Sequence, residues 1–251
     1  MKKNNKNILI TGSTSGLGWE IAKYFYNNNY SVGINGRNFK KLKQIKKKYT
    51  DLSINHGDIT NYQSAKNVIQ SFIKENGRLD TLVCNVGNGS LNKLKEKKNI
   101  NIWKKMFDIN FWSAINIIDN ALPHLKKTKG KIICISSICG LENIEGAPIS
   151  YSVAKNALNT FVKNYSFEVG KLGIRINAVI PGNLMFKGSI WSKKIKKNKK
   201  KTMEYIYKNV PLSKFGKASD VISMIEYLDD EKSSFVTGSL ITIDGGQTKG
   251  F

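Results

Sequence analysis

A tyrosine and a lysine four residues apart, Tyr151 and Lys155, are the residues of this sequence whose types and spacing best suit acid–base chemistry. In a helix, positions i and i+4 lie on the same face, so the phenol and the ammonium can point into one space. A neighbouring cation favours the phenolate and lowers the pKa of a tyrosine, which is normally about 10. We therefore expect Lys155 to lower the pKa of Tyr151, so that the phenol exchanges a proton near neutral pH.

A glycine-rich loop near the start of the chain is the second chemical signal. It reads Thr11-Gly12-Ser13-Thr14-Ser15-Gly16-Leu17-Gly18, follows the apolar run Ile8–Ile10, and precedes a helix-like segment that starts at Trp19. Glycines let the backbone approach a pyrophosphate, and the first turn of a helix offers free N–H groups and a positive dipole end. A strand, a glycine loop and a helix in this order predict a dinucleotide site.

The elements that must position these residues alternate along the whole chain. Most of the expected strands are continuous apolar runs, which is typical of a parallel sheet buried on both faces. Their alternation with helical patterns predicts an α/β fold: a single-domain, doubly wound Rossmann sheet of about seven strands with helices on both faces, spanning residues 1–251. The expected strands are Asn7–Thr11, Tyr30–Asn35, Leu52–His56, Asp80–Asn85, Lys131–Ser136, Ile174–Ile180 and Ser239–Asp244. The expected helices are Gly16–Asn28, Phe39–Tyr49, Asn61–Asn76, Ile102–Leu125, Tyr151–Leu172 and Ser219–Leu228.

The composition argues against several classes of protein. No apolar run approaches the roughly 20 residues that span a membrane. The apolar stretch that follows the basic start Met1–Asn7 is too short for a signal peptide and runs directly into the glycine loop, so we expect no signal peptide and a cytoplasmic location. The 3 cysteines form no pair close in sequence, and the 2 histidines have no neighbouring ligand cluster, so neither a disulfide framework nor a metal site is expected.

The chain is strongly basic, with a formal net charge of +23. Such a charge suits nucleic acid, anionic membranes or acidic substrates. No aromatic residues interleave with the lysines in a stacking pattern, which argues against a nucleic-acid partner. The densest run, Lys193–Lys201, lies in the longest segment without an expected strand. We expect this segment, 183–210, to be a solvated lid that either attracts an anionic substrate or is simply a soluble loop.

The resemblance of this sequence to the short-chain dehydrogenase/reductase family covers essentially its whole length. The glycine loop resembles the family's T-G-x-x-x-G-x-G, and Asp80–Gly87 resembles its D-x-L-V-N-N-A-G. Tyr151 and Lys155 fall on its Y-x-x-x-K, and Pro181-Gly182 on its P-G. The C-terminal motif is matched by Phe235–Gly238 and Asp244–Gly246. Cys84 and Val86 depart from the family pattern, and no threonine follows Pro181-Gly182 at the usual place.

The resemblance implies the roles of the site residues. Tyr151 is the expected general acid or base, and Ser137 binds the substrate oxygen. Lys155 also holds the nicotinamide ribose, and Asn110 supports a proton relay to it. The residues expected to bind the cofactor are Gly12, Ser13, Thr14, Ser15, Gly16, Leu17, Gly18, Arg37, Asp58, Ile59, Asn85, Val86, Gly87, Tyr151, Lys155, Pro181 and Gly182.

The end of the second expected strand bears on the choice of cofactor. Gly36 stands where NAD-dependent members carry an acid, and the guanidinium of Arg37 can bind a 2′-phosphate. The glycine loop, in contrast, lacks the basic residue that many NADP-dependent members add. We expect NADP as the cofactor, with NAD as the alternative.

The expected activity is the interconversion of a carbonyl and a secondary alcohol by an NAD(P)-dependent oxidoreductase. One hypothesis for the substrate is a 3-oxoacyl-[acyl-carrier-protein], because a basic surface suits an acidic carrier. Another is a sugar or nucleotide-sugar ketone of surface-polysaccharide synthesis. A dinucleotide-binding scaffold without activity is the non-enzymatic alternative. We also expect a homotetramer or homodimer, because the helices Ile102–Leu125 and Tyr151–Leu172 carry apolar residues on more than one face.

Overall fold

The computed structural model describes residues 6–89 and 99–250. Seven parallel strands form one sheet in the order β3-β2-β1-β4-β5-β6-β7, with every neighbouring pair parallel. The strands are β1 (Asn7–Ile10), β2 (Ser31–Gly36), β3 (Ser53–His56), β4 (Thr81–Cys84), β5 (Lys131–Ile135), β6 (Arg175–Pro181) and β7 (Leu240–Ile243). The predicted doubly wound sheet is confirmed. Each end of every predicted strand lies within two residues of the corresponding end of an observed strand.

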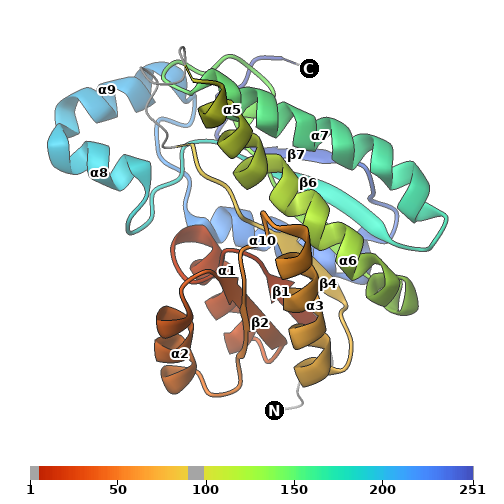
Figure 1. Cartoon of the computed structure of the whole chain (residues 1–251). Coiled ribbons are helices and arrows are strands. Elements are labelled where there is room, and N and C mark those ends of the chain that lie inside the picture. Colours follow the sequence, from red (N-terminus) through yellow and green to blue (C-terminus); the bar gives the residue numbers. More distant parts are fainter. Residues whose placement is uncertain (1–5, 90–98, 251) are drawn as a thin grey trace.

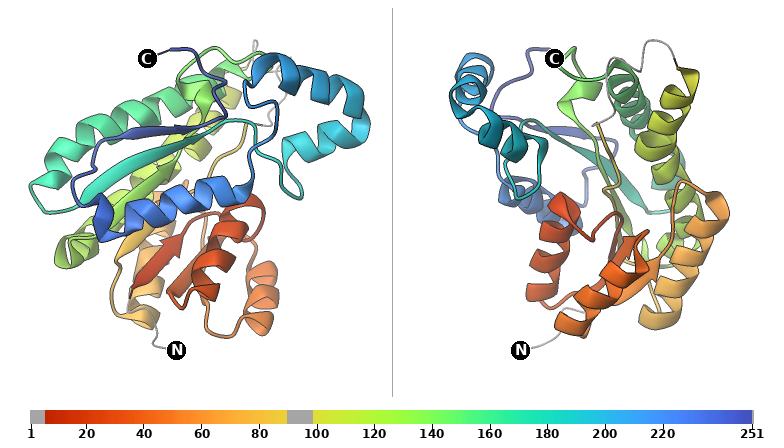
Figure 2. Two further views of the ribbon diagram at one scale, coloured as in Figure 1. Left: turned by 180° about the vertical axis from the view of Figure 1, so that it is seen from behind. Right: turned by 60° about the vertical axis from the view of Figure 1, so that its left-hand side comes forward.

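Helices cover both faces of this sheet, as the two turned views in Figure 2 show. On one face lie α1 (Gly16–Asn27), α2 (Phe39–Lys48) and α10 (Ala218–Asp229). Their buried apolar side chains form a core with the strand side chains that point to this face. On the other face lie α3 (Tyr62–Asn76), α6 (Ser113–Thr128) and α7 (Ile149–Gly170). Two cores of branched aliphatic side chains thus hold the sheet from both sides, which fits its continuous apolar strands.

The predicted single helix Ile102–Leu125 is wrong in one respect. The segment starts as α5 (Ile100–Phe107), widens to a π-helical turn at Asp108–Trp112, and continues as α6. Such a turn inserts one residue into the helical ladder and changes the direction of the side chains within it, which is common at functional sites. Asn110 lies in the middle of this turn. The periodicity of the sequence does not reveal the insertion, because the same apolar faces continue on either side.

The segment expected to be a lid, 183–210, is largely helical. It contains α8 (Ile190–Lys197) and α9 (Lys199–Asn209), each started by an asparagine or serine side chain that accepts a backbone N–H. Figure 1 shows this pair of helices standing away from the sheet, beyond the carboxyl ends of the strands. The sequence analysis expected a solvated segment here and predicted neither helix. The lysines of Lys193–Lys201 are exposed.

The apolar surplus predicted for the two long helices is partly absorbed by the core. Met106, Ile118, Leu158 and Val162 are all buried, with at most 1% of their surface exposed. Other side chains of these helices stay exposed, among them Trp112 at 47% and Phe167 at 71%. Cys84 and Cys134, which are far apart in the sequence, face each other on β4 and β5 as free, buried cysteines.

Candidate active site

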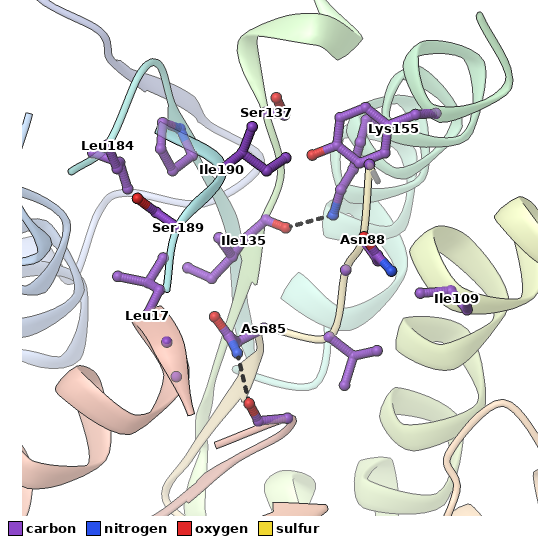
Figure 3. Close-up of a pocket in the computed structure, with 18 of the residues that line it drawn as sticks. Leu17, Asn85, Asn88, Ile109, Ile135, Ser137, Lys155, Leu184, Ser189 and Ile190 are labelled. Carbon is purple, nitrogen blue, oxygen red and sulfur yellow. Dashed lines mark hydrogen bonds between the residues drawn. The ribbon is translucent and has the colours of Figure 1, made fainter. Parts of the chain in front are cut away.

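One cleft of about 680 Å³ contains nearly all of the residues predicted to act on cofactor or substrate. It lies along the carboxyl ends of the strands, where open α/β sheets bind their ligands. From the glycine loop it runs past the ends of β2 and β4 to Ser137, Tyr151 and Lys155, and then to α8 and α9. Figure 3 shows side chains from several different elements pointing into this space.

The glycine loop forms the floor of one end of the cleft. Gly12 and Gly16 have positive φ angles of 60° and 61°, which a residue with a β-carbon rarely adopts. A β-carbon on Gly18 would lie 2.4 Å from Nδ2 of Asn85 and 2.7 Å from the carbonyl oxygen of Gly12. The loop therefore fits a pyrophosphate, because the backbone is bare where a phosphate would approach the start of α1.

Neighbouring strands brace this loop from below. Nδ2 of Asn85 donates to the carbonyl of Thr11 at 3.0 Å, and the Asn85 amide donates to the Thr11 hydroxyl at 2.9 Å. Oδ1 of Asn35 accepts from the Gly12 amide at 3.3 Å. Sequence reasoning missed Asn35, whose buried amide gave no motif signal. Ser13 also belongs to this bracing, since its hydroxyl is buried and donates to the Ile10 carbonyl at 2.6 Å instead of lining the cleft.

The end of β2 and the segment after β3 shape the cleft beside the glycine loop, where a β-carbon on Gly36 would meet Thr14. Arg37 and Asp58 approach each other at 3.6 Å, with 73% and 44% of their side chains exposed. Oδ1 of Asp58 accepts from the amide and the hydroxyl of Thr60. Ile59 is buried and contributes an apolar patch to the lining. Both Arg37 and Asp58 line the cleft, in line with the positions predicted for them.

Lys155 and Asn110 meet beside the end of β4. The Lys155 ammonium donates to the carbonyl of Ile135 at 2.8 Å, a contact drawn in Figure 3, and only 2% of the residue is exposed. Oδ1 of Asn110 accepts from the Asn88 amide at 2.8 Å, and its Nδ2 donates to the carbonyls of Asn88 and Met106. A β-carbon on Gly87 would lie 3.2 Å from both Oδ1 of Asn110 and Nζ of Lys155. Glycine at this position therefore keeps the space between the two groups open.

Tyr151 and Ser137 line the cleft next to Lys155. Burial raises the pKa of Tyr151 to about 12, while a hydrogen bond with Ser137 acts in the opposite direction. Burial lowers the pKa of Lys155 to about 8. The prediction that Lys155 lowers the pKa of Tyr151 is therefore wrong for this structure. The two residues share a helical face, but the lysine amine is drawn toward the Ile135 carbonyl and both groups are desolvated.

The far end of the cleft is formed by residues that no sequence motif marked. Trp191 of α8 and Tyr205 of α9 stack with their ring centroids 5.2 Å apart and their planes 28° from parallel. Nζ of Lys194 lies 4.1 Å above the Trp191 ring. The rest of the cleft lining from the neighbouring segments is mostly apolar: Ile144, Ala147, Pro148, Leu184 and Ile190, with the exposed Glu145. The feature of the sequence that could have pointed to these residues is the presence of Trp191 and Tyr205 on either side of a lysine-rich stretch.

Within 6–89 and 99–250, no group of three or more His, Cys, Asp or Glu side chains could hold a metal ion. None of the helices in those ranges is both long enough and apolar enough to cross a bilayer.

Comparisons with known proteins agree with this architecture. The family model described as enoyl-(acyl carrier protein) reductase matches residues 12–248. The 3-oxoacyl-[acyl-carrier-protein] reductase FabG of Rickettsia felis is 32% identical, over 96% of this chain and 96% of its own. FabG of Chlamydia trachomatis is 30% identical, over 96% and 97%. The solved structure of ElxO with NADP bound is 32% identical, covers 96% of this chain and 98% of its own, and has a TM-score of 0.87.

A doubly wound sheet with a glycine loop and a Tyr-x-x-x-Lys pair in one cleft defines a dinucleotide-dependent oxidoreductase. The chain belongs to the short-chain dehydrogenase/reductase family of NAD(P)-dependent enzymes, as the match over residues 12–248 shows.

Proposed function

We propose that this enzyme reduces a ketone to a secondary alcohol with NADPH, and that Tyr151 supplies the proton. The observation that carries the proposal is the position of Tyr151, Ser137 and Lys155 in the same cleft as the glycine loop. With a pKa of about 12, the Tyr151 phenol keeps its proton at neutral pH and is ready to donate it. A bound nicotinamide would supply the hydride.

Each neighbouring residue has a distinct part in this proposal. The Ser137 hydroxyl donates a hydrogen bond to the substrate oxygen as charge develops on it. Lys155, protonated below about pH 8, places a positive charge beside the reacting groups and binds the nicotinamide ribose. Asn110 holds the segment at Asn88 in place, and the space that Gly87 leaves open between Asn110 and Lys155 is the path by which protons reach Lys155.

The proposed cofactor residues follow from the fit of the cleft. The backbone of Gly12–Gly18 holds the pyrophosphate, and Asp58 with Ile59 contacts the adenine. Arg37 binds the 2′-phosphate of NADP, which its exposed guanidinium can reach from the end of β2. At the other end, Asn85, Val86, Gly87, Pro181 and Gly182 enclose the nicotinamide half.

The lining beyond Tyr151 favours a substrate with an apolar body. Aliphatic and aromatic side chains dominate there, and Lys194 lines the same end. A 3-oxoacyl group on an acidic carrier combines an apolar chain with negative charge, so we propose it ahead of a sugar or nucleotide-sugar ketone. The relatives named FabG support this choice.

A panel of substrates tests the proposal. The purified enzyme is assayed by absorbance of the reduced cofactor, with NADPH and NADH in turn. The panel holds a short 3-oxoacyl thioester, the same group on a carrier protein, a nucleotide-sugar ketone and simple ketones. We expect turnover of the 3-oxoacyl substrates with NADPH. Dinucleotide binding without turnover of any carbonyl would instead favour the scaffold hypothesis.

We also propose a homodimer or homotetramer that pairs α5 and α6 with α7. The exposed apolar side chains Trp112, Val153 and Phe167 line these helices, and Phe161 stacks on Tyr165 beside them. Light scattering of the wild type, Phe167→Asp and Tyr207→Asp tests this. Both side chains are largely exposed, but Tyr207 belongs to the lid. Only the Phe167→Asp variant should show a lower molar mass in solution than the wild type. A monomeric wild type contradicts the proposal.

A further inference from the structure

The C-terminal turn, Asp244–Thr248, is a rigid piece of backbone that touches the base of the lid. The Asp244 carboxylate accepts from the Gly246 amide at 2.9 Å, the Thr248 amide at 2.7 Å and the Thr248 hydroxyl at 2.8 Å. Leu212, just beyond α9, donates its amide to the Gly245 carbonyl at 3.1 Å. A β-carbon on Gly245 would lie 2.9 Å from Cγ1 of Val210, so the turn packs directly against the end of α9.

Gln247 projects from this turn into the interior and joins two parts of the site. Its Oε1 accepts from Nδ2 of Asn183 at 2.5 Å, and its Nε2 donates to the hydroxyl of Tyr205 at 3.4 Å. Gln247 is 7% exposed and Asn183 9%, so water competes little for either amide. Asn183 follows Pro181-Gly182 at the end of β6 and lines the cleft. The Gln247 amide therefore connects the end of the central sheet to α9.

The position of α8 depends on the position of the Tyr205 ring. No residue of α8 is buried, so this helix has little core of its own to hold it. The Trp191 ring stacks on Tyr205, its centroid lies 5.4 Å from that of the Phe215 ring, and Nζ of Lys194 lies over the Trp191 ring itself. A displacement of Tyr205 would thus move Trp191 and Lys194, which form the substrate end of the cleft.

We propose that Gln247 is a positioning residue that holds the lid over the substrate end of the cleft, through Tyr205 and Trp191. Its second hydrogen bond, to Asn183, makes the position of the lid responsive to whatever occupies the cleft at Pro181–Asn183. Gln247 then determines the affinity for the carbonyl substrate without taking part in the chemical step. The effect on substrate affinity rests on the proposed function, whereas the effect on how firmly the lid is held in place does not.

Limited trypsin digestion followed by mass spectrometry measures the lid order directly. The lid carries the lysine run Lys193–Lys201, and α2 carries a second run, Lys40–Lys48, which serves as an internal reference in the same molecule. Gln247→Met keeps the length of the side chain and removes its amide. We expect cleavage in the lid, relative to cleavage in α2, to rise about threefold to tenfold, as the loss of the one hydrogen bond that reaches the lid, from Gln247 to Tyr205, implies. An unchanged ratio overturns the proposal.

Tyr205→Phe provides a second variant, which keeps the aromatic stack and removes only the hydroxyl. It should raise the lid-to-α2 ratio in the same direction as Gln247→Met, and the double variant should be no worse than Gln247→Met alone, because both changes remove the hydrogen bond between Gln247 and Tyr205. Tyr207→Phe, on the same helix and 60% exposed, is the matched control and should match the wild type. Additive effects of the two changes would mean that Gln247 acts elsewhere and would overturn the proposal.

Kinetics on the best carbonyl substrate complete the test. Gln247→Met should raise KM about threefold to tenfold and leave kcat and the dissociation constant of the dinucleotide close to wild type. An equal loss in dinucleotide affinity would assign Gln247 to the cofactor site and contradict the proposal. If the wild type turns over no carbonyl, the proposed function fails while the digestion result still decides the role of Gln247.

Discussion

The methyl group of Thr14 lies 2.6 Å from the position that a β-carbon on Gly36 would occupy. Thr14 therefore fills the space in which an acidic side chain at position 36 would bind the ribose hydroxyls of NAD. Arg37, the next residue, extends its side chain into solvent beside the same end of the cleft. This arrangement suits a 2′-phosphate, because the guanidinium is a charged donor and Gly36 places no carboxylate where the phosphate would lie.

The first prediction concerns this end of the cleft. Arg37→Ala should weaken NADPH binding about tenfold, as expected for the loss of a charge-assisted hydrogen bond at an exposed site, and leave NADH binding nearly unchanged. Gly36→Asp should weaken NADPH binding, and it should improve NADH binding only when combined with Thr14→Ala, which removes the blocking methyl group. Fluorescence titration of the wild type and of each variant with NADPH and with NADH measures these dissociation constants. Equal effects of Arg37→Ala on NADPH and NADH would show that Arg37 does not meet the 2′-phosphate.

The second prediction concerns the proton donor. Tyr151→Phe should lower turnover by about a thousandfold or more while dinucleotide affinity stays close to wild type, because the proton is lost and the ring is kept. Lys155→Met should impair both turnover and affinity, since one ammonium serves both. Steady-state kinetics and dinucleotide titration separate the two outcomes. Activity of Tyr151→Phe above a few per cent of wild type would remove the phenol from the acid role.

The third prediction is a pH dependence. The pKa of Lys155 is lowered to about 8, so its amine is charged below that pH and loses the charge as the pH rises through it. Tyr151, with a pKa of about 12, stays protonated throughout this range. Dinucleotide affinity of the free enzyme should therefore be constant from about pH 6 to pH 7 and fall above about pH 8. A plateau that extends to about pH 10 would mean that Lys155 keeps its ordinary pKa.

The fourth prediction concerns the lysines of the lid. Lys196, Lys197, Lys199 and Lys200 are exposed, so their field reaches about 10 Å into solution at 0.1 M salt. If the substrate is anionic, kcat/KM should fall steeply as ionic strength rises. Replacing these four lysines with glutamine should flatten the dependence, and a neutral substrate of the same enzyme serves as the control. A flat salt profile in the wild type would leave the lid lysines without a role in attracting substrate.

Local patterns sufficed for the sheet and for most of the cleft. The strands are continuous apolar runs, and the glycine loop and the pair Tyr151 and Lys155 are defined by spacing within one turn or one helix. The strand order brings the carboxyl ends of β1, β4, β5 and β6 side by side, and Asn85 and Ser137, which the resemblance assigns to the site, line the cleft there.

Contacts between distant segments decided the rest. The π-helical turn at Asn110, the aromatic stack of Trp191 on Tyr205 and the link through Gln247 join residues without a common motif. The pKa of Tyr151 shows the physical reason most clearly. Sequence spacing indicates that Lys155 is near and predicts a lowered pKa, whereas burial, which depends on the whole surrounding fold, raises it to about 12. Spacing along a helix thus specified which groups share the site, and only their packing against β5 and the neighbouring loops determined how those groups are solvated.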